Sequence, residues 1–318
     1  MPHHDVLPTP ETVHWGCLDA GLPAILEVKL GDTVTIHSVS GAPGELANDP
    51  AYLVRPELRA IHRSQVPSPG PHILTGPIHV SGAKPGDMLR VEIIEVKLRD
   101  NWAFNIIRPG KGALPDDFHE DQVVHLGIDR EAGTIATPWG MNWSARPFFG
   151  VMATAPRPED GRLTSIVPGY FGGNMDNQEL TAGSVLFLPV SVEGALFSAG
   201  DGHASQGDGE VCLTAVETGL SGTFRFDLIK NATSLMPYAQ TPDHLIAMAF
   251  HEDLQQAMQS AVRAAVGMIV ERCGITAAEA YSLCSMAADV RVTQVVNIKK
   301  GVHVMIPMTL LNQKAREA

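Results

Sequence analysis

Short runs of apolar residues with alternating polar ones, separated by Gly and Pro, fill most of the chain before Pro242. Such runs are typical of β-strands joined by turns, and they favour a sandwich or barrel over alternating strands and helices. The runs at 24–30 and 33–40 flank a Gly31-Asp32 turn, which predicts a β-hairpin. Further strands are expected at 76–83, 88–98, 123–128, 134–138, 185–192, 195–200, 211–216 and 222–229.

Apolar residues at helical spacing begin only after Pro242. One helix is expected over 252–272, because its apolar residues fall on one face. Thr276 and Glu279 match a capping box, which predicts the start of a second helix that runs to about residue 288. A closing pair of strands is expected at 289–297 and 301–307.

The chain is therefore predicted to be mainly β, with a smaller α+β region toward its C-terminal side. No repeat, low-complexity tract or flexible linker interrupts it. We predict a β-rich body at residues 1–240 that carries the functional site, and an α+β region at residues 241–318 that packs on this body.

The composition describes a globular protein with few clustered basic residues. Of 318 residues, 44% are hydrophobic and 18% are charged, and the formal net charge is -12 at pH 7. Nucleic acid is not expected as a partner, because phosphate binding requires clustered Lys and Arg. The N-terminal segment lacks a signal-peptide pattern and no apolar run reaches the roughly 20 residues of a membrane span, so we expect a cytoplasmic protein with no membrane partner. The four scattered cysteines predict neither a disulfide framework nor a thiolate zinc site.

Side chains that commonly bind metals are concentrated at residues 198–211, which read SAGDGHASQGDGEV. In extended backbone, side chains two residues apart point to the same side, so Asp201 pairs with His203 and Asp208 pairs with Glu210. The interleaved glycines allow the chain to turn closely around whatever these side chains hold. Carboxylate and imidazole are common zinc ligands, and a remaining carboxylate supplies the base for metal-assisted hydrolysis.

A second polar turn, PGYFGGNMDNQEL at 168–180, places Asn174 and Asp176 two residues apart. Both offer oxygen ligands on one side of an extended segment. His72 is a third candidate, because the Pro-rich loop around it holds it as a ligand or as a hydrogen-bond donor to a substrate carbonyl. We expect the two acidic, glycine-rich turns to converge on one site.

Other interpretations compete with a catalytic metal site. Gly and Asp are ordinary turn residues, so both segments also fit solvated surface turns. A calcium loop needs oxygen ligands at alternate positions, and His203 stands where the EF-hand pattern requires an oxygen. The chain has no G-x-S-x-G elbow for a serine nucleophile, and it has no dinucleotide fingerprint or P-loop.

Several segments resemble the acetamidase/formamidase family, in the same order along the chain: GPHILTGPIHVSGAKPGD, GGNMDNQEL, GDGHASQGDGE, AYSLCSMAADVRVTQVVN and GVHVMIP. The resemblance runs from about Trp15 to Pro307. It implies a β-rich fold with sandwich or jelly-roll-like sheets and a small β-barrel part. It also implies a homodimer or larger homo-oligomer that hydrolyses short-chain amides, such as formamide or acetamide, to ammonia and a carboxylic acid.

The resemblance further implies a divalent metal, most often Zn²⁺, held by Asp176, Asp201 and His203. Such a metal would activate a water for attack on the amide carbonyl. Two alternatives stay open: a hydrolase of another linear C–N substrate on the same scaffold, and a non-catalytic binding protein whose acidic loops hold Ca²⁺. Metal analysis together with an ammonia-release assay distinguishes these alternatives.

The same motifs imply roles for the other polar residues of the site. Glu210 and Asp208 are the acid and base candidates, and His72 is a catalytic candidate that would stabilise the oxyanion. Asn174 and Gln206 are expected to lie near the substrate.

Overall fold

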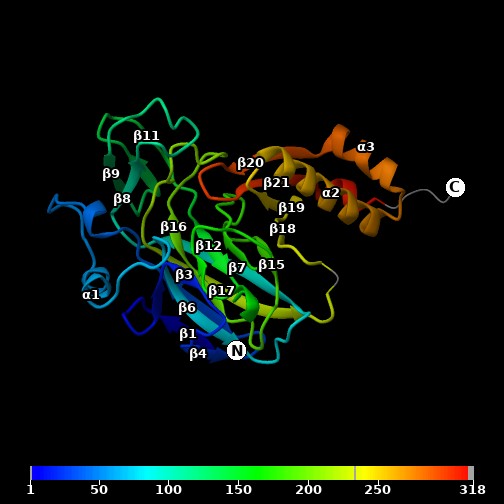
Figure 1. Cartoon of the computed structure of the whole chain (residues 1–318), viewed down its shortest axis with the longest axis horizontal. Helices are drawn as coiled ribbons and strands as arrows, with labels where there is room; N and C mark the ends of the chain where they lie inside the picture. The colour runs from blue at the N-terminus through cyan, green and yellow to red at the C-terminus, as the bar shows by residue number, and fades with distance from the viewer. Residues whose placement is uncertain (1, 233, 314–318) are drawn as a thin grey trace.

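The computed structural model describes residues 2–232 and 234–313, and it shows two packed β-sheets with smaller elements at both ends (Figure 1). A lobe of short strands stands at one end, and two longer helices cover the sheet at the opposite end. The fold is mainly β, as the sequence predicts. Its sheets are open, and none of the strands in the described residues closes the small barrel that was expected.

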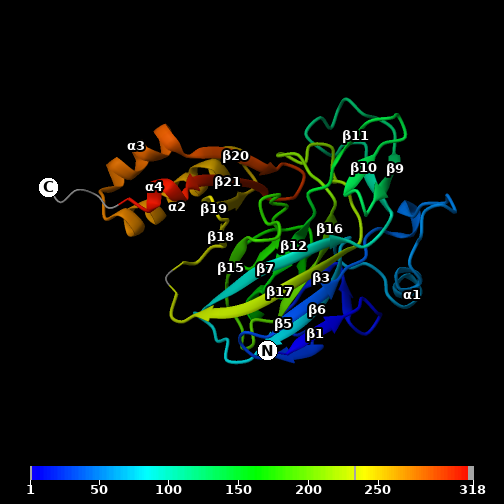
Figure 2. The ribbon, with the colours of Figure 1, turned by 180° about the vertical axis from the view of Figure 1, so that it is seen from behind.

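The large sheet contains nine strands within the described residues and is antiparallel except for the β1–β5 pair. Its longest strands, β7 and β17, pair along their whole length and cross the body side by side (Figure 2). β17 alternates buried and partly exposed residues, because one of its faces packs against the core. In order across the sheet, the strands are β1 His3–Val6, β5 Thr33–His37, β17 Leu220–Ile229, β7 Met88–Leu98, β15 Val185–Pro189, β18 Tyr238–Gln240, β19 His244–His251, β21 Lys300–Pro307 and β20 Asp289–Gln294.

A second sheet packs face to face on the large one. Phe197 of this sheet contacts Phe224 and Phe226 of β17, with ring centroids 5.7 and 5.1 Å apart. These aromatic residues belong to one apolar core between the two sheets. In order, the strands are β14 Gly172–Asn174, β12 Phe148–Ala153, β16 Phe197–His203, β6 Ile73–Val80 and β2 Val13–Trp15, with β4 Leu26–Val28 paired in parallel to β6.

The remaining strands form the lobe and one two-stranded pair. The lobe consists of β8 Trp102–Ile107, β9 Gln122–Asp129, β10 Thr134–Ala136 and β11 Asn142–Ser144. The other short elements are β3 Cys17–Leu18, β13 Leu163–Thr164, α1 Pro56–Ser64 and two 3₁₀ turns, η1 Pro43–Glu45 and η2 Pro158–Asp160.

The helices after β19 confirm the helical part of the sequence analysis. α2 Leu254–Cys273 buries a row of small and apolar side chains against β19 and β21. α3 Ala277–Ala287 begins with the predicted capping box, because the Thr276 side chain accepts from the Glu279 backbone N–H and Glu279 reaches back. α4 Met308–Leu311 follows β21.

Two strand predictions are wrong. The runs at 24–30 and 33–40 do not form a hairpin, because β4 pairs with β6 and β5 pairs with β1 and β17. The run at 211–216 is not a strand, since it contributes a single isolated bridge to β8, between Ile107 and Leu213. In both cases the partners are distant in the sequence, and local patterning does not reveal them.

The large sheet crosses the proposed division at residue 240, because β15 pairs with β18 and β18 pairs with β19. The division into a body and a C-terminal region therefore stays a proposal. Within the described part of the chain, no helix combines the length and apolarity needed to span a bilayer.

Candidate functional site

Gly150 lies in the middle of the candidate site, in β12 between β14 and β16. A Cβ atom at this position would lie 2.5 Å from Asp176 Oδ1 and 2.5 Å from Asp201 Oδ2. The missing side chain therefore makes room for carboxyl groups from both flanking segments. The structure thus brings together the two glycine-rich turns that the sequence analysis selected.

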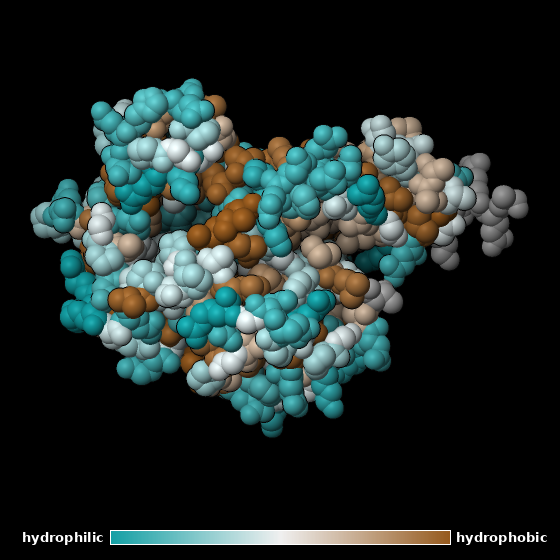
Figure 3. All heavy atoms as spheres, in the orientation of Figure 1, coloured by the Kyte–Doolittle hydropathy of each residue, from teal (hydrophilic) through white to brown (hydrophobic). Residues whose placement is uncertain are grey.

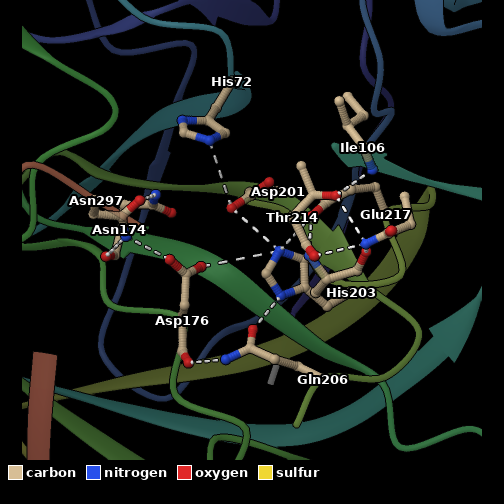
Figure 4. Close-up of polar contacts among 12 residues, drawn as sticks. His72, Ile106, Asn174, Asp176, Asp201, His203, Gln206, Thr214, Glu217 and Asn297 are labelled. Carbon is tan, nitrogen blue, oxygen red and sulfur yellow. Dashed lines mark hydrogen bonds and ion pairs between the residues drawn. The ribbon is translucent and has the colours of Figure 1, made fainter. Parts of the chain in front are cut away.

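Asp176 follows β14 and is fixed by hydrogen bonds from distant parts of the chain (Figure 4). Its Oδ2 accepts from Asn297 Nδ2 at 2.7 Å, and its backbone carbonyl accepts from Gln206 Nε2 at 2.7 Å. With its amide nitrogen turned inward, Asn174 donates to Asp176 Oδ1 and Asp201 Oδ2 at 3.1 and 3.0 Å. Asn297 belongs to the β20–β21 loop, so the C-terminal part of the chain completes this side of the site.

His203 ends β16 and is fully buried among carboxylates. Its Nε2 lies 3.2 Å from Glu217 Oε1, 3.4 Å from Asp201 Oδ2 and 3.9 Å from Asp176 Oδ1. Its Nδ1 lies 3.0 Å from Gln206 Oε1. The Gln206 amide nitrogen faces two backbone carbonyls, so its oxygen must face the ring and accept the Nδ1–H. This hydrogen bond orients the imidazole with Nε2 toward the acids.

Three acids of the site adopt left-handed backbone, with φ of 48° at Asp176, 58° at Asp201 and 45° at Glu210. This region is uncommon for residues other than glycine and costs of order 1 kcal/mol or more at each position. The surrounding fold therefore imposes these conformations and directs the three carboxyl groups inward.

Glu210 and Glu217 are both buried and approach the cluster from the segment that follows β16. Glu210, Asp176 and His203 each offer one ligand atom, and these three atoms lie within 4.8 Å of one another. The same is true of Glu217, Asp201 and His203. The backbone of Glu217 bridges both Phe104 and His203, which places its side chain beside the imidazole. Glu217 was missed by the sequence analysis, because no local motif marks it.

The buried acids oppose one another's ionisation. Burial and repulsion from Asp201 raise the pKa of Glu217 to about 8. Burial and repulsion from Asp176 raise the pKa of Glu210 well above its ordinary value. Burial alone would lower the pKa of His203, but Glu217 and Asp201 raise it well above 6.5. Additional positive charge is therefore required for all these carboxylates to be ionised together.

A cavity of about 350 Å³ opens above the cluster, and Asp201, Glu210 and Glu217 contribute to its lining. Figure 3 shows the surface hollowed beside the lobe, with hydrophobic residues gathered along the hollow. His72 also lines the cavity, with its Nε2 3.8 Å from Asp201 Oδ2 and its Nδ1 2.8 Å from Ser165 Oγ. The structure thus places His72 near Asp201 from the residue directly before β6.

Two predicted positions require correction. Asp208 does not point with Glu210, because Asp208 is exposed and accepts a hydrogen bond from Gln178 Nε2 at 2.7 Å. The tight turn between them, with Glu210 in left-handed backbone, breaks the alternation of an extended strand. Gln206 does not face the main cavity, since both ends of its amide are occupied by His203 and backbone carbonyls. Gln206 instead orients the imidazole of His203.

Comparison with known proteins places this arrangement in a family. The chain is 30% identical over 270 residues to an acetamidase from Mycolicibacterium smegmatis, covering 66% of this chain and 64% of that protein. It is 29% identical over 243 residues to a formamidase from Methylophilus methylotrophus, covering 60% of this chain and 57% of that protein. The chain thus spans less than two thirds of the length of these curated relatives.

The crystal structure of an acetamidase from Bacillus halodurans superposes with a TM-score of 0.83 at 26% identity, covering 96% of this chain and 97% of that chain. The model of the Acetamidase/Formamidase family matches residues 18–160 and 159–313. These matches cover nearly the whole described chain, including every residue of the site. The chain therefore belongs to the acetamidase/formamidase family.

Proposed function

We propose that this chain is a metal-dependent amidohydrolase that cleaves the C–N bond of short-chain linear amides to ammonia and a carboxylic acid. The observation that carries this proposal is the buried group of four carboxylates around His203 at the floor of the cavity. The relatives named acetamidase and formamidase supply the reaction class.

The donor groups at the cavity floor fit a divalent cation. His203 Nε2, Glu210 Oε2 and Glu217 Oε2 are buried and have no hydrogen-bond partner among the described residues. Polar atoms that are buried without a partner are costly, and a cation would satisfy them. We propose Asp176, Asp201 and His203 as ligands, with Glu217 as a further oxygen donor.

The donor set favours zinc over calcium. Zinc accepts imidazole nitrogen together with carboxylate oxygen, whereas calcium prefers roughly six to eight oxygen ligands. The central position of His203 Nε2 among the carboxylates supports the first choice. When bound, such a cation polarises the amide carbonyl and lowers the pKa of water at the site.

Glu210 is the proposed general base and general acid. Its carboxylate accepts no hydrogen bond from the described residues, whereas Glu217 Oε1 accepts from the Ala215 backbone N–H at 3.0 Å. Glu210 would take a proton from the attacking water as the water oxygen bonds to the carbonyl carbon. It would return that proton to nitrogen as the C–N bond breaks, because an amide anion is a very poor leaving group. The products are the carboxylic acid and ammonia.

His72 is proposed to hold the amide oxygen. Its backbone N–H donates to Ser165 Oγ at 3.3 Å, so the hydroxyl hydrogen of Ser165 is available to donate to Nδ1 at 2.8 Å. This arrangement leaves the hydrogen on Nε2, which faces the cavity beside Asp201. A donor placed there would stabilise the negative charge that develops on the amide oxygen.

The test is ammonia release from formamide and acetamide, combined with metal analysis of the purified protein. We predict that Glu210→Gln keeps its metal and loses about 10²-fold or more in kcat, because it removes the proton carrier alone. His203→Ala should lose the metal. Glu193→Gln serves as the matched control, because Glu193 is exposed and lies in another loop.

Unchanged hydrolysis by Glu210→Gln would refute its proposed role. A protein that binds calcium and releases no ammonia from any amide would refute the proposed activity. Hydrolysis of an imide or a carbamoyl compound in preference to linear amides would instead identify a different hydrolase on the same scaffold.

A further inference from the structure

The cavity above the site is larger than formamide or acetamide requires. Its volume of about 350 Å³ falls within the range of sites for drug-sized ligands. Acetamide is only a few times the size of a water molecule, which takes about 30 Å³ in the liquid. The cavity is therefore built to hold a longer molecule.

Part of the cavity wall is apolar. Phe104 and Ile106 of β8 form one side, and Ile166, Leu213 and Val296 contribute from other segments. Side chains of this kind contact methylene groups favourably and offer no hydrogen bonds. This part of the wall therefore suits an alkyl chain.

Two cationic residues, Arg108 and Lys111, line the same cavity. The guanidinium of Arg108 is partly exposed and forms ion pairs with Asp121 at 3.3 Å and with Glu45, which also lines the cavity, at 3.5 Å. Lys111 is exposed and makes no ion pair with the described residues. The chain has a net charge of -12, yet the cavity lining includes two cationic side chains. They can receive an anionic group.

The fold separates Arg108 from Glu217 along β8. Phe104 pairs with Glu217 through its backbone, and Arg108 follows the end of β8 four residues later. At about 3.3 Å per residue, the backbone of Arg108 lies roughly 13 Å along the strand direction from this pair. A molecule that lies along β8 between Glu217 and Arg108 therefore needs several carbons between its two polar ends.

The cationic segment is held in a fixed position against the acidic one. Ile107 bridges Leu213, and the Ala113 backbone N–H donates to the Val211 carbonyl at 2.8 Å. Gly112 has φ of 79°, and a Cβ there would lie 2.8 Å from the Cys212 carbonyl oxygen. The loop that carries Arg108 and Lys111 is therefore packed closely on the segment that follows Glu210.

We propose that the substrate of this site is a linear primary amide whose acyl chain ends in a carboxylate, that is, a half-amide of a dicarboxylic acid. The amide lies at the acidic floor, the alkyl chain lies along Phe104 and Ile106, and the carboxylate binds Arg108 and Lys111. This inference rests on the proposed amidohydrolase function and names its substrate class.

The experiment compares glutaramic and adipamic acids with pentanamide and hexanamide, which have the same numbers of carbons and lack the charge. We expect a higher kcat/KM for the half-amides in the metal-loaded native protein. Arg108→Gln and Lys111→Gln should each lower the ratio of kcat/KM for charged over neutral amides, by about tenfold for Arg108. The neutral amides serve as the internal reference in each variant, so the ratio reports recognition of the carboxylate.

Two further variants separate recognition from folding effects. Arg108→Lys keeps the charge and should retain part of the preference, since only the forked geometry is lost. Arg59→Gln removes an equal charge from the exposed face of α1 and should change nothing. An equal kcat/KM for charged and neutral amides in the native protein, or a ratio that Arg108→Gln leaves unchanged, would overturn the proposal.

A binding measurement keeps this inference distinct from the proposed activity. Calorimetric titration with glutarate, compared between the native protein and Arg108→Gln, tests the cations without any turnover. Binding that is clearly weaker in Arg108→Gln supports the pocket assignment, and equal binding by the two proteins overturns it. If no amide is hydrolysed although glutarate binds through Arg108, the amidohydrolase proposal fails while the anion site stands.

Discussion

The absence of a side chain at Gly150 leaves the space that the carboxyl groups of Asp176 and Asp201 occupy. Gly150→Ala would place a methyl group 2.5 Å from both the Asp176 and the Asp201 carboxyl oxygens. We predict that this variant folds, because β12 stays apolar, but loses most of its bound metal and amide hydrolysis. Metal content and ammonia release measure the effect.

Gly127→Ala is the matched control for this prediction. Gly127 also lies within a strand, and the nearest atom to an added Cβ is the Tyr52 hydroxyl at 3.6 Å, an ordinary contact distance. Full metal content in Gly150→Ala would show that the carboxyl groups do not need this space.

A buried histidine outside the site contributes to the pH dependence of stability. Burial lowers the pKa of His14 from 6.5 to about 4. The neutral ring forms hydrogen bonds with the Cys17 carbonyl at 2.7 Å and with the Ser198 hydroxyl at 2.9 Å. Between these pH values the unfolded chain binds more protons, so the free energy of unfolding falls as pH falls from 6.5 toward 4. The loss from this group amounts to about 3 kcal/mol.

His14→Gln should flatten that dependence in urea unfolding measured from pH 6.5 to 4.5, although it lowers stability at neutral pH. The exposed His119 provides the control, because His119→Gln should follow the native curve. Parallel curves for His14→Gln and the native protein would contradict the assignment.

At the scale of single elements, the capping box of α3 supplies a local test. Thr276→Ala removes the side-chain acceptor for the Glu279 backbone N–H and should lower the free energy of unfolding by about 1 kcal/mol. Ser282→Ala, in the exposed middle of the same helix, should be neutral or slightly stabilising. Equal effects of the two substitutions in chemical denaturation would show that the cap contributes nothing.

Elements encoded by local sequence could be predicted, whereas strand pairing between distant segments could not. α3 could be predicted because its capping box and its helical residues lie within a dozen positions of one another. β17 could be predicted because its apolar and polar residues alternate along one segment. The supposed hairpin at 24–40 failed because β4 and β5 pair with strands far along the chain. Turn residues alone do not reveal such partners.

Prediction of the site was limited in the same way. Asp201 and His203 stand in one dense motif, and the structure brings them to Asp176 as expected. Glu217 and Asn297 carry no motif and reach the cluster only through tertiary pairing. Asp208 was misplaced, because the extended geometry assumed for its segment ends in a tight turn.

For the molecule as a whole, the proposed cation should contribute to stability. The acids come from segments on both sides of β12, so a cation bound among them would stabilise the native state over the unfolded one. Free zinc at about 1,000 times its dissociation constant adds roughly 4 kcal/mol by mass action. We predict that a chelator lowers Tm and that added zinc restores it.

The double variant Asp176→Asn, Glu217→Gln is the comparison for this experiment. It removes two carboxylates from the buried cluster, so its Tm should respond much less to chelator or zinc. A native protein shown by elemental analysis to have lost its metal, yet with an unaltered Tm, would exclude a structural contribution.

The hydrogen bond from Asn297 to Asp176 links positions 121 residues apart. Because ribosomes extend a polypeptide from its N-terminus, Asp176 leaves the exit tunnel well before the amide that steadies it. The acidic centre is therefore finished only after Asn297 has been synthesised, and a nascent chain that stalls before this residue carries Asp176 without its brace.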